Sequence, residues 1–182
     1  MPIKPLATIA AIAIATALAA CETMPSSGRW DAPRFNPSSV AWSKRTGGNV
    51  ITGVARLEAE NGKLRTCASL PVRLAPDSAY TRERVQLLYG DADAAFVDAQ
   101  EAQRARAQPG AQVTRAYEST LKAATCDATG RFVFKDLPDG TYYVMAPVVW
   151  RGKLGEVSEG GFFMQRVTVQ GGETARVALA MQ

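Results

Sequence analysis

The stretch TCDATGRFVFKDLPDGTY, residues 125–142, decides the fold class of this chain. Turn-forming residues lie near both of its ends, Asp127–Gly130 on one side and Pro138–Gly140 on the other. Between these turns Phe132 and Phe134 alternate with other side chains, and a period of two is typical of a strand that buries one face. The stretch therefore predicts a β-strand, a tight turn and the start of a second strand.

Runs with the same strand character lie on both sides of this stretch. Residues 49–55 alternate with a period of two, and the run 174–180 places Ala175, Val177 and Leu179 on one side. Several short strands separated by turn residues favour a mainly β fold, an antiparallel β-sandwich. The other predicted strands are residues 71–74, 141–149 and 162–169.

Residues 77–125 interrupt the strand pattern. Their apolar residues recur every three or four positions, which is typical of an amphipathic helix, and helix-forming residues continue to Ala107. Gly90 is a point where the run can divide into two helices, and Pro109-Gly110 ends it. We therefore expect a helical insertion between two blocks of strands, with an apolar stripe formed by Val85, Leu88, Ala92, Phe96 and Ala99.

The N-terminus predicts export and lipidation. Lys4 precedes an uncharged apolar run, residues 6–20, which is short for a membrane span but suits a signal peptide. The run ends Leu18-Ala19-Ala20-Cys21, which resembles the bacterial lipobox. The resemblance implies cleavage after residue 20 and a lipid on the Cys21 thiol. Ordinary signal cleavage and an uncleaved anchor are the alternatives.

Position 22 is a glutamate, Glu22, and not an aspartate. This favours the outer membrane as the location, with the domain facing the periplasm. A soluble periplasmic or secreted protein is the alternative location. Residues 22–48 are rich in proline, serine and glycine, and with Cys21 they are expected to form a flexible tether. Trp30, Phe35 and Trp42 interrupt this composition, so part of the tether is expected to dock on the domain, which spans 49–182.

Lipidation of Cys21 would leave two cysteines, Cys67 and Cys126, on either side of the helical insertion. In an oxidising compartment such a pair tends to form a disulfide. We expect this disulfide to hold the insertion against the sandwich, and two buried free thiols are the alternative.

The motif in residues 125–142 resembles the carboxypeptidase regulatory-like repeat. In that family a threonine, an Asp-x-x-Gly turn and Phe-x-Phe precede Leu-Pro-x-Gly-x-Tyr. The resemblance covers about residues 49–76 and 124–180 and leaves the helical insertion outside. It implies a sandwich of the transthyretin (prealbumin-like) or carbohydrate-binding-like kind, and it is nearly silent on function.

The residues of the motif have folding roles. Gly130 and Gly140 suit tight turns, and Pro138 fixes φ in the second turn. Tyr142 is expected to bury its ring while its hydroxyl bonds back to that turn.

The composition argues against several function classes. The chain has no histidine, which removes the usual general base and the commonest metal ligand, so we expect neither an enzyme nor a cofactor. Its 21 basic and 17 acidic residues alternate in sign, so we expect no nucleic-acid partner. The aspartate pairs Asp91/Asp93 and Asp136/Asp139 are expected to lie at a helix cap and in a turn rather than to bind calcium.

The most suggestive candidate site is the polar stretch around Trp150, Arg151, Phe162 and Phe163. Sugars stack on aromatic rings while charged side chains bond their hydroxyls, so a glycan site fits the chemistry. The alternatives are core residues at the mouth of a hairpin, and a surface for a protein partner.

Taken together, the sequence predicts an envelope lipoprotein, held at the membrane by its lipid, whose sandwich is a non-catalytic binding or structural module. The alternative functions are a carbohydrate- or peptidoglycan-binding module, and an accessory outer-membrane lipoprotein of a secretion or envelope assembly.

Overall fold

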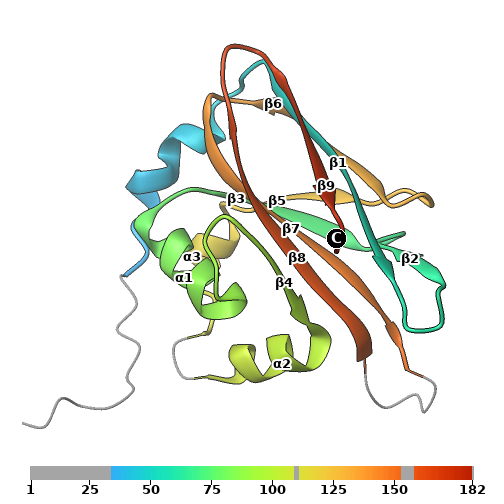
Figure 1. Cartoon of the computed structure of the whole chain (residues 1–182). Coiled ribbons are helices and arrows are strands. Elements are labelled where there is room, and N and C mark those ends of the chain that lie inside the picture. Colours follow the sequence, from blue (N-terminus) through green and yellow to red (C-terminus); the bar gives the residue numbers. More distant parts are fainter. Residues whose placement is uncertain (1–33, 109–110, 153–157, 182) are drawn as a thin grey trace, which may run out of the picture.

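Two β-sheets packed face to face form a sandwich, and helices cover the outer face of one sheet (Figure 1). The computed structural model describes residues 34–108, 111–152 and 158–181. The predicted mainly β sandwich is therefore confirmed. The smaller sheet contains β2 (Leu64–Thr66), β1 (Asn49–Glu58), β6 (Arg131–Leu137) and β9 (Thr174–Leu179). The larger sheet has the order β4 (Ala94–Asp98), β8 (Ser158–Val169), β7 (Gly140–Arg151), β3 (Pro71–Pro76) and β5 (Lys122–Thr125).

The core lies between the inner faces of the two sheets. Phe132 and Phe134 of β6 are both buried there, as their alternation predicts. Along β7, Val144, Ala146 and Val148 belong to the same core because every second side chain of a strand points to one face. The motif that decides the fold thus supplies one strand to each sheet.

β1 is the central strand of the smaller sheet. It pairs antiparallel with β6, for example Ile51 with Phe134, and parallel with β9, from Val50 opposite Thr174 to Ala55 opposite Leu179. The last described strand therefore completes the pairing of the first one.

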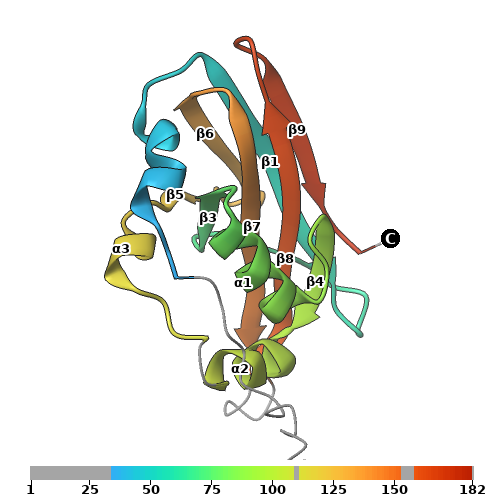
Figure 2. The same cartoon turned by 90° about the vertical axis from the view of Figure 1, so that its left-hand side faces the viewer.

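The helical insertion is only partly helical. Three helices cover the outer face of the larger sheet (Figure 2): α1 (Ala79–Tyr89), α2 (Ala99–Ala107) and α3 (Arg115–Glu118). Between α1 and α2 the chain forms β4, which pairs antiparallel with β8 at the edge of the sheet. The predicted helical insertion, residues 77–125, is therefore wrong for β4, and its last four residues form the strand β5.

The predicted apolar helical stripe does not continue past Gly90, and the reason is local. Gly90 caps α1 in the left-handed conformation, at φ 73°. Asp91 Oδ1 then accepts hydrogen bonds from the backbone N–H groups of Asp93 and Ala94, so it turns the chain into β4 and does not cap a following helix. Phe96 lies on this strand and not on a helix, while the proposed stop at Pro109-Gly110 lies outside the described residues.

Residues 34–48, directly before β1, pack in order against the domain, so the prediction of a flexible tether is wrong for these residues. Asn36 caps a 3₁₀ helix, η1 (Pro37–Lys44), and Val40 of this helix is fully buried. The Trp42 ring packs edge-on against Tyr142, with ring centroids 5.2 Å apart. Phe35 packs against Tyr80 and Tyr117, so Phe35 and Trp42 dock as expected, whereas Trp30 lies outside the described residues.

The disulfide between Cys67 and Cys126 is confirmed. Cys67 directly follows β2 and Cys126 directly follows β5, and these are edge strands of different sheets. Both cysteines are buried, and their Cα atoms are 5.7 Å apart. The covalent bond therefore joins the two layers of the sandwich.

One end of the sandwich is closed by hydrogen bonds to the buried side chain of Asn49. Its Nδ2 donates to the Leu137 carbonyl at 2.9 Å and to Asp139 Oδ1 at 2.8 Å. Its Oδ1 accepts from the backbone N–H groups of Gly172 and Glu173. Asn49 therefore joins the start of β1 to the β6–β7 and β8–β9 turns.

The turn between β6 and β7 is further held by the expected tyrosine bond. The Tyr142 hydroxyl donates to the Pro138 carbonyl at 3.0 Å. Among the described residues, no helix is long and apolar enough to cross a membrane.

Candidate functional site

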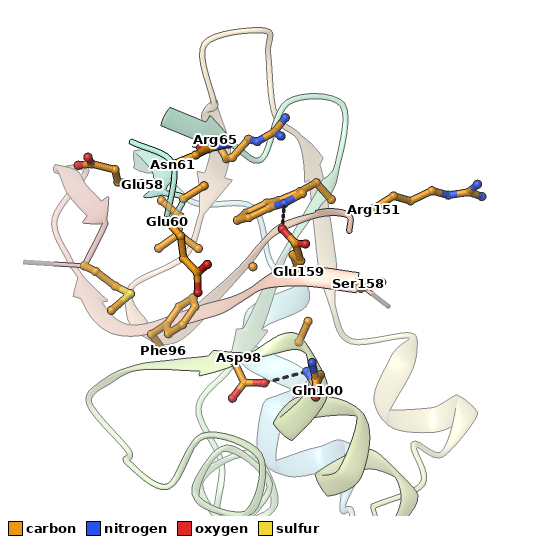
Figure 3. Close-up of a pocket in the computed structure, with 16 residues that line it drawn as sticks. Glu58, Glu60, Asn61, Arg65, Phe96, Asp98, Gln100, Arg151, Ser158 and Glu159 are labelled. Atoms are coloured by element: carbon orange, nitrogen blue, oxygen red, sulfur yellow. Dashed lines mark hydrogen bonds between the residues drawn. The ribbon is translucent and has the colours of Figure 1, made fainter. Parts of the chain in front are cut away.

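The four residues predicted as one patch lie on two faces of the larger sheet. Phe163 points into the sandwich and is 4% exposed, whereas its neighbour Phe162 points to the opposite face. There the Arg106 guanidinium lies 4.2 Å from the centre of the Phe162 ring. Trp150 packs against the core cluster that contains Phe163. Arg151 is exposed, and its side chain extends away from the other labelled residues (Figure 3).

Trp150 lines a cavity of about 720 Å³ at the open end of the sandwich (Figure 3). Three parts of the fold form its walls: the β1–β2 hairpin, the junction of β4 with α2, and the ends of β7 and β8. The cavity lies where the two sheets separate, at the end of the sandwich opposite Asn49. Its polar and aromatic lining residues include Glu58, Glu60, Asn61, Arg65, Phe96, Asp98, Gln100, Trp150, Arg151, Ser158 and Glu159.

The Trp150 ring is held in place from several sides. Its indole N–H donates to Glu159 Oε2 at 2.7 Å, and the Arg65 guanidinium lies 5.2 Å from the ring centre. Gly160 has φ 86°, and a Cβ there would collide with the Trp150 ring and the Val148 carbonyl. The ring thus lies against bare backbone, and glycine is needed to leave it room.

A second aromatic ring lines the same cavity. Phe96, from β4, is partly exposed, and its ring centre lies 4.8 Å from that of the buried Phe163. Gly161 leaves room for the Phe96 ring in the same way that Gly160 does for Trp150. Both rings are therefore supported from behind and present apolar surface to the cavity.

Only some of the polar groups that line the cavity form hydrogen bonds within the protein. Asp98 Oδ1 accepts from the backbone N–H groups of Gln100 and Glu101 and so caps α2. Arg65 Nε is buried and has no hydrogen-bond partner among the described residues. Among the described residues, four carboxylates (Glu58, Glu60, Asp98 and Glu159) and two arginines (Arg65 and Arg151) line the cavity, so the balance of these charges is acidic.

Metal binding finds no support in the described part of the chain. No group of three or more cysteine, aspartate or glutamate residues there could hold an ion. Asp139 Oδ1 bonds to Asn49 and to the Gly171 N–H, and these bonds lower the pKa of the Asp139 carboxyl below its usual value.

The cavity that contains Trp150 offers groups suited to binding. They are aromatic surface, carboxylates and amides that can bond hydroxyls, and the Arg65 Nε donor, which has no partner among the described residues.

The sequence analysis named Trp150 as a candidate site residue but did not name Arg65 or Phe96, which line the same cavity. Arg65 belongs to a strand of three residues, which has too few positions to show a period. Phe96 fitted the helical spacing of residues 85–99, and that spacing hid its place on an edge strand. Only the pairing of β4 with β8 brings Phe96 to the cavity.

A solved bacterial structure is similar to this chain. It is PA1324 from Pseudomonas aeruginosa, a proposed carbohydrate-binding protein. The two chains share 27% sequence identity with a TM-score of 0.65, and the match covers 83% of this chain and 100% of the other. No protein-family model matches the chain, and no curated protein matches it.

The similarity to PA1324 covers that protein completely, and it supports the β-sandwich and a role as a binding module. The resemblance to carboxypeptidase regulatory-like repeats rests on the residues of the motif itself.

Proposed function

We propose that the chain is a non-catalytic carbohydrate-binding module and that its ligand occupies the cavity at the open end. The observation that carries this proposal is the combination of Trp150 and Phe96 with carboxylate, amide and guanidinium groups in one cavity. Sugars need both kinds of contact, because a ring face is apolar while its hydroxyls require hydrogen-bond partners. The similarity to PA1324, itself proposed to bind carbohydrate, supports the same conclusion.

The charges of the cavity favour a neutral sugar over an acidic one. The four carboxylates and two arginines among its described lining residues would repel a uronic acid more than they attract it, since like charges in an interface act against binding. Arg65 Nε has no hydrogen-bond partner among the described residues. A sugar hydroxyl that accepts a hydrogen bond from it would satisfy this buried donor.

The test is a titration of chitotetraose, a neutral N-acetylglucosamine oligosaccharide, into the full-length chain by calorimetry. We expect Trp150→Ala to weaken binding about tenfold, because the loss of an aromatic contact costs about 1.5 kcal/mol. The matched control is Phe162→Ala, which removes an aromatic ring of the same hairpin on the other face of the sheet. It should leave the affinity unchanged.

Three outcomes would contradict the sugar proposal. Equal binding by wild type and Trp150→Ala would exclude the cavity, and tighter binding of tetragalacturonate than of chitotetraose would exclude a neutral ligand. Failure of every neutral glycan on an array to bind would exclude the function.

We also propose that a lipid on Cys21 holds this module at the bacterial outer membrane, facing the periplasm. The support is the sequence Leu18-Ala19-Ala20-Cys21 after an apolar run, and these residues lie outside the described part of the structure. Cys21→Ser should abolish incorporation of labelled palmitate in growing cells, and unchanged labelling would refute the anchor. Membership of a secretion or envelope assembly stays a prediction.

A further inference from the structure

A second cavity lies on the opposite face of the larger sheet. It measures about 320 Å³, and its lining residues include residues of β3, β7 and β8 on one side and of α1, α2 and α3 on the other. Figure 2 shows these helices against that face of the sheet. Its lining is mostly apolar and includes Val85, Leu88, Val113, Leu121, Met145 and Phe162. The sheet separates it from the cavity that contains Trp150, so the two cavities are independent.

A buried arginine without an ion-pair partner lines this apolar cavity. Arg84, from α1, is 7% exposed, and it takes part in neither of the ion pairs found among the described residues. Its Nη1 also has no hydrogen-bond partner in the described part of the chain. A buried guanidinium loses its hydration, and no protein hydrogen bond replaces that hydration at Arg84 Nη1 in the described residues. The group therefore destabilises the fold when no ligand is bound.

The other charged groups make the cavity basic. Arg73 from β3 and Arg106 from α2 also line it, and Glu118 is its one acidic lining residue among those described. Tyr89 stands between the helices, where burial raises the pKa of its hydroxyl to about 12 even though Arg106 and Arg84 act in the opposite direction. Tyr89 is therefore neutral at physiological pH, and the three arginines attract an anion that the tyrosine does not repel.

We propose that this cavity binds a small apolar acid. Its carboxylate would accept hydrogen bonds from the Arg84 guanidinium, and its apolar part would lie against Val85, Met145 and Phe162. The pairing satisfies the one buried cation of the cavity, because a carboxylate matches the planar donors of arginine. The volume is at the lower end of the range for small-molecule sites, which suits a compact ligand.

Decanoate is the probe, used below its micelle concentration with the full-length Cys21→Ser chain, which has no thiol at position 21 to take a lipid. We expect decanoate to bind and to shift the methyl signals of Val113 and Met145 in NMR spectra. Decanol and decyltrimethylammonium have similar tails with a neutral and a positive end, and they should bind at least about tenfold more weakly because hydrogen bonds to charged groups contribute about 1.5 to 3 kcal/mol.

Arg84→Met is the variant that tests the arginine. It keeps an apolar side chain of similar length and should weaken decanoate binding about thirtyfold, the factor expected for a lost charge-assisted bond. Decanol binding should stay unchanged. Arg104→Met is the matched control, since Arg104 is an exposed arginine of α2 that does not line the cavity.

Equal affinity for decanoate and decanol would overturn the proposal, and this comparison uses no substitution at position 84. Undiminished decanoate binding by a folded Arg84→Met variant, an absence of binding, or shifts confined to the Trp150 cavity would also overturn it. Chitotetraose binding should be the same with and without decanoate, so a failure of either proposed site leaves the other testable.

Discussion

The two ends of the sandwich are built from the same strands but treat their polar groups in opposite ways. At the closed end, all four hydrogen-bonding positions of the Asn49 amide are occupied by protein partners. At the open end, Arg65 Nε has no partner among the described residues, and Glu58 and Glu60 are exposed. The closed end therefore stabilises the fold, and the open end carries the polar groups that we propose bind a ligand.

Two tryptophans show the same difference. Trp42 packs on Tyr142 beside the β6–β7 turn, and a side chain at Gly140 would collide with its ring. Trp150, ten residues along β7 from Gly140, is partly exposed in the open-end cavity. One strand thus carries a structural contact at its start and the proposed binding contact at its end, so substitutions at the two ends should have separate effects on stability and on sugar affinity.

The largest effect is expected from removing the disulfide, which lies near the open end because Cys67 follows Arg65 by two residues. The double variant Cys67→Ala, Cys126→Ala should lose about 4 kcal/mol of unfolding free energy, since it frees a long loop in the unfolded chain. Denaturant titration measures this loss, with reduced wild type as the control. A loss below about 1 kcal/mol would show that the hydrogen bonds of the closed end suffice to hold the layers together.

A somewhat smaller loss is expected at the closed end. Asn49→Leu should cost about 3 kcal/mol, because it leaves the partners of the amide without their bonds. The folded variant should bind chitotetraose like wild type. Asn36→Ala, which removes an exposed helix cap, should cost at most about 1 kcal/mol. Loss of sugar affinity in folded Asn49→Leu would show that the two ends are coupled.

The smallest effect concerns acid stability. Asn49 and the Gly171 N–H lower the pKa of Asp139 in the folded chain, so the ionised carboxylate stabilises the fold above its usual pKa of 3.8. This stabilisation is lost as the pH falls through the lowered value. Asp139→Asn keeps an acceptor oxygen and should reduce the loss of melting temperature between about pH 4 and 2.

Some acid sensitivity should remain in this variant, because the Arg131 N–H and the Thr129 hydroxyl also lower the pKa of Asp127. If the melting temperature of Asp139→Asn depended on pH in the same way as that of wild type, the ionised Asp139 carboxylate would not stabilise the closed end.

Residues with a strong local signal could be predicted from the sequence. Phe132, Phe134 and Tyr142 occupy the positions that alternation and turn residues indicate, and the cysteine pair follows from counting. β4 could not be predicted, since Phe96 fits both a helical stripe and an edge strand covered on both faces. Asn49 carries no local signal either, because its four partners lie about 90 or more residues away in the chain.

The candidate sites were harder to predict than the fold. Trp150 stood out as an aromatic residue in a polar stretch, but alternation along β8 places Phe163 in the core and Phe162 at the second cavity. Arg84 resembles an ordinary charged helix residue in the sequence. Only the packing of α1 against the sheet reveals that its guanidinium is buried.

The parallel pairing of β1 with β9 also sets the order in which the domain can fold. A ribosome releases the N-terminal part of a chain first, so β1 emerges early while its partner, the last described strand, emerges late. Until then residues 50–55 of β1 lack a neighbour on one edge, and such long-range pairing is slow because the loop between the strands must close first. The smaller sheet therefore stays incomplete until β9 has been synthesised.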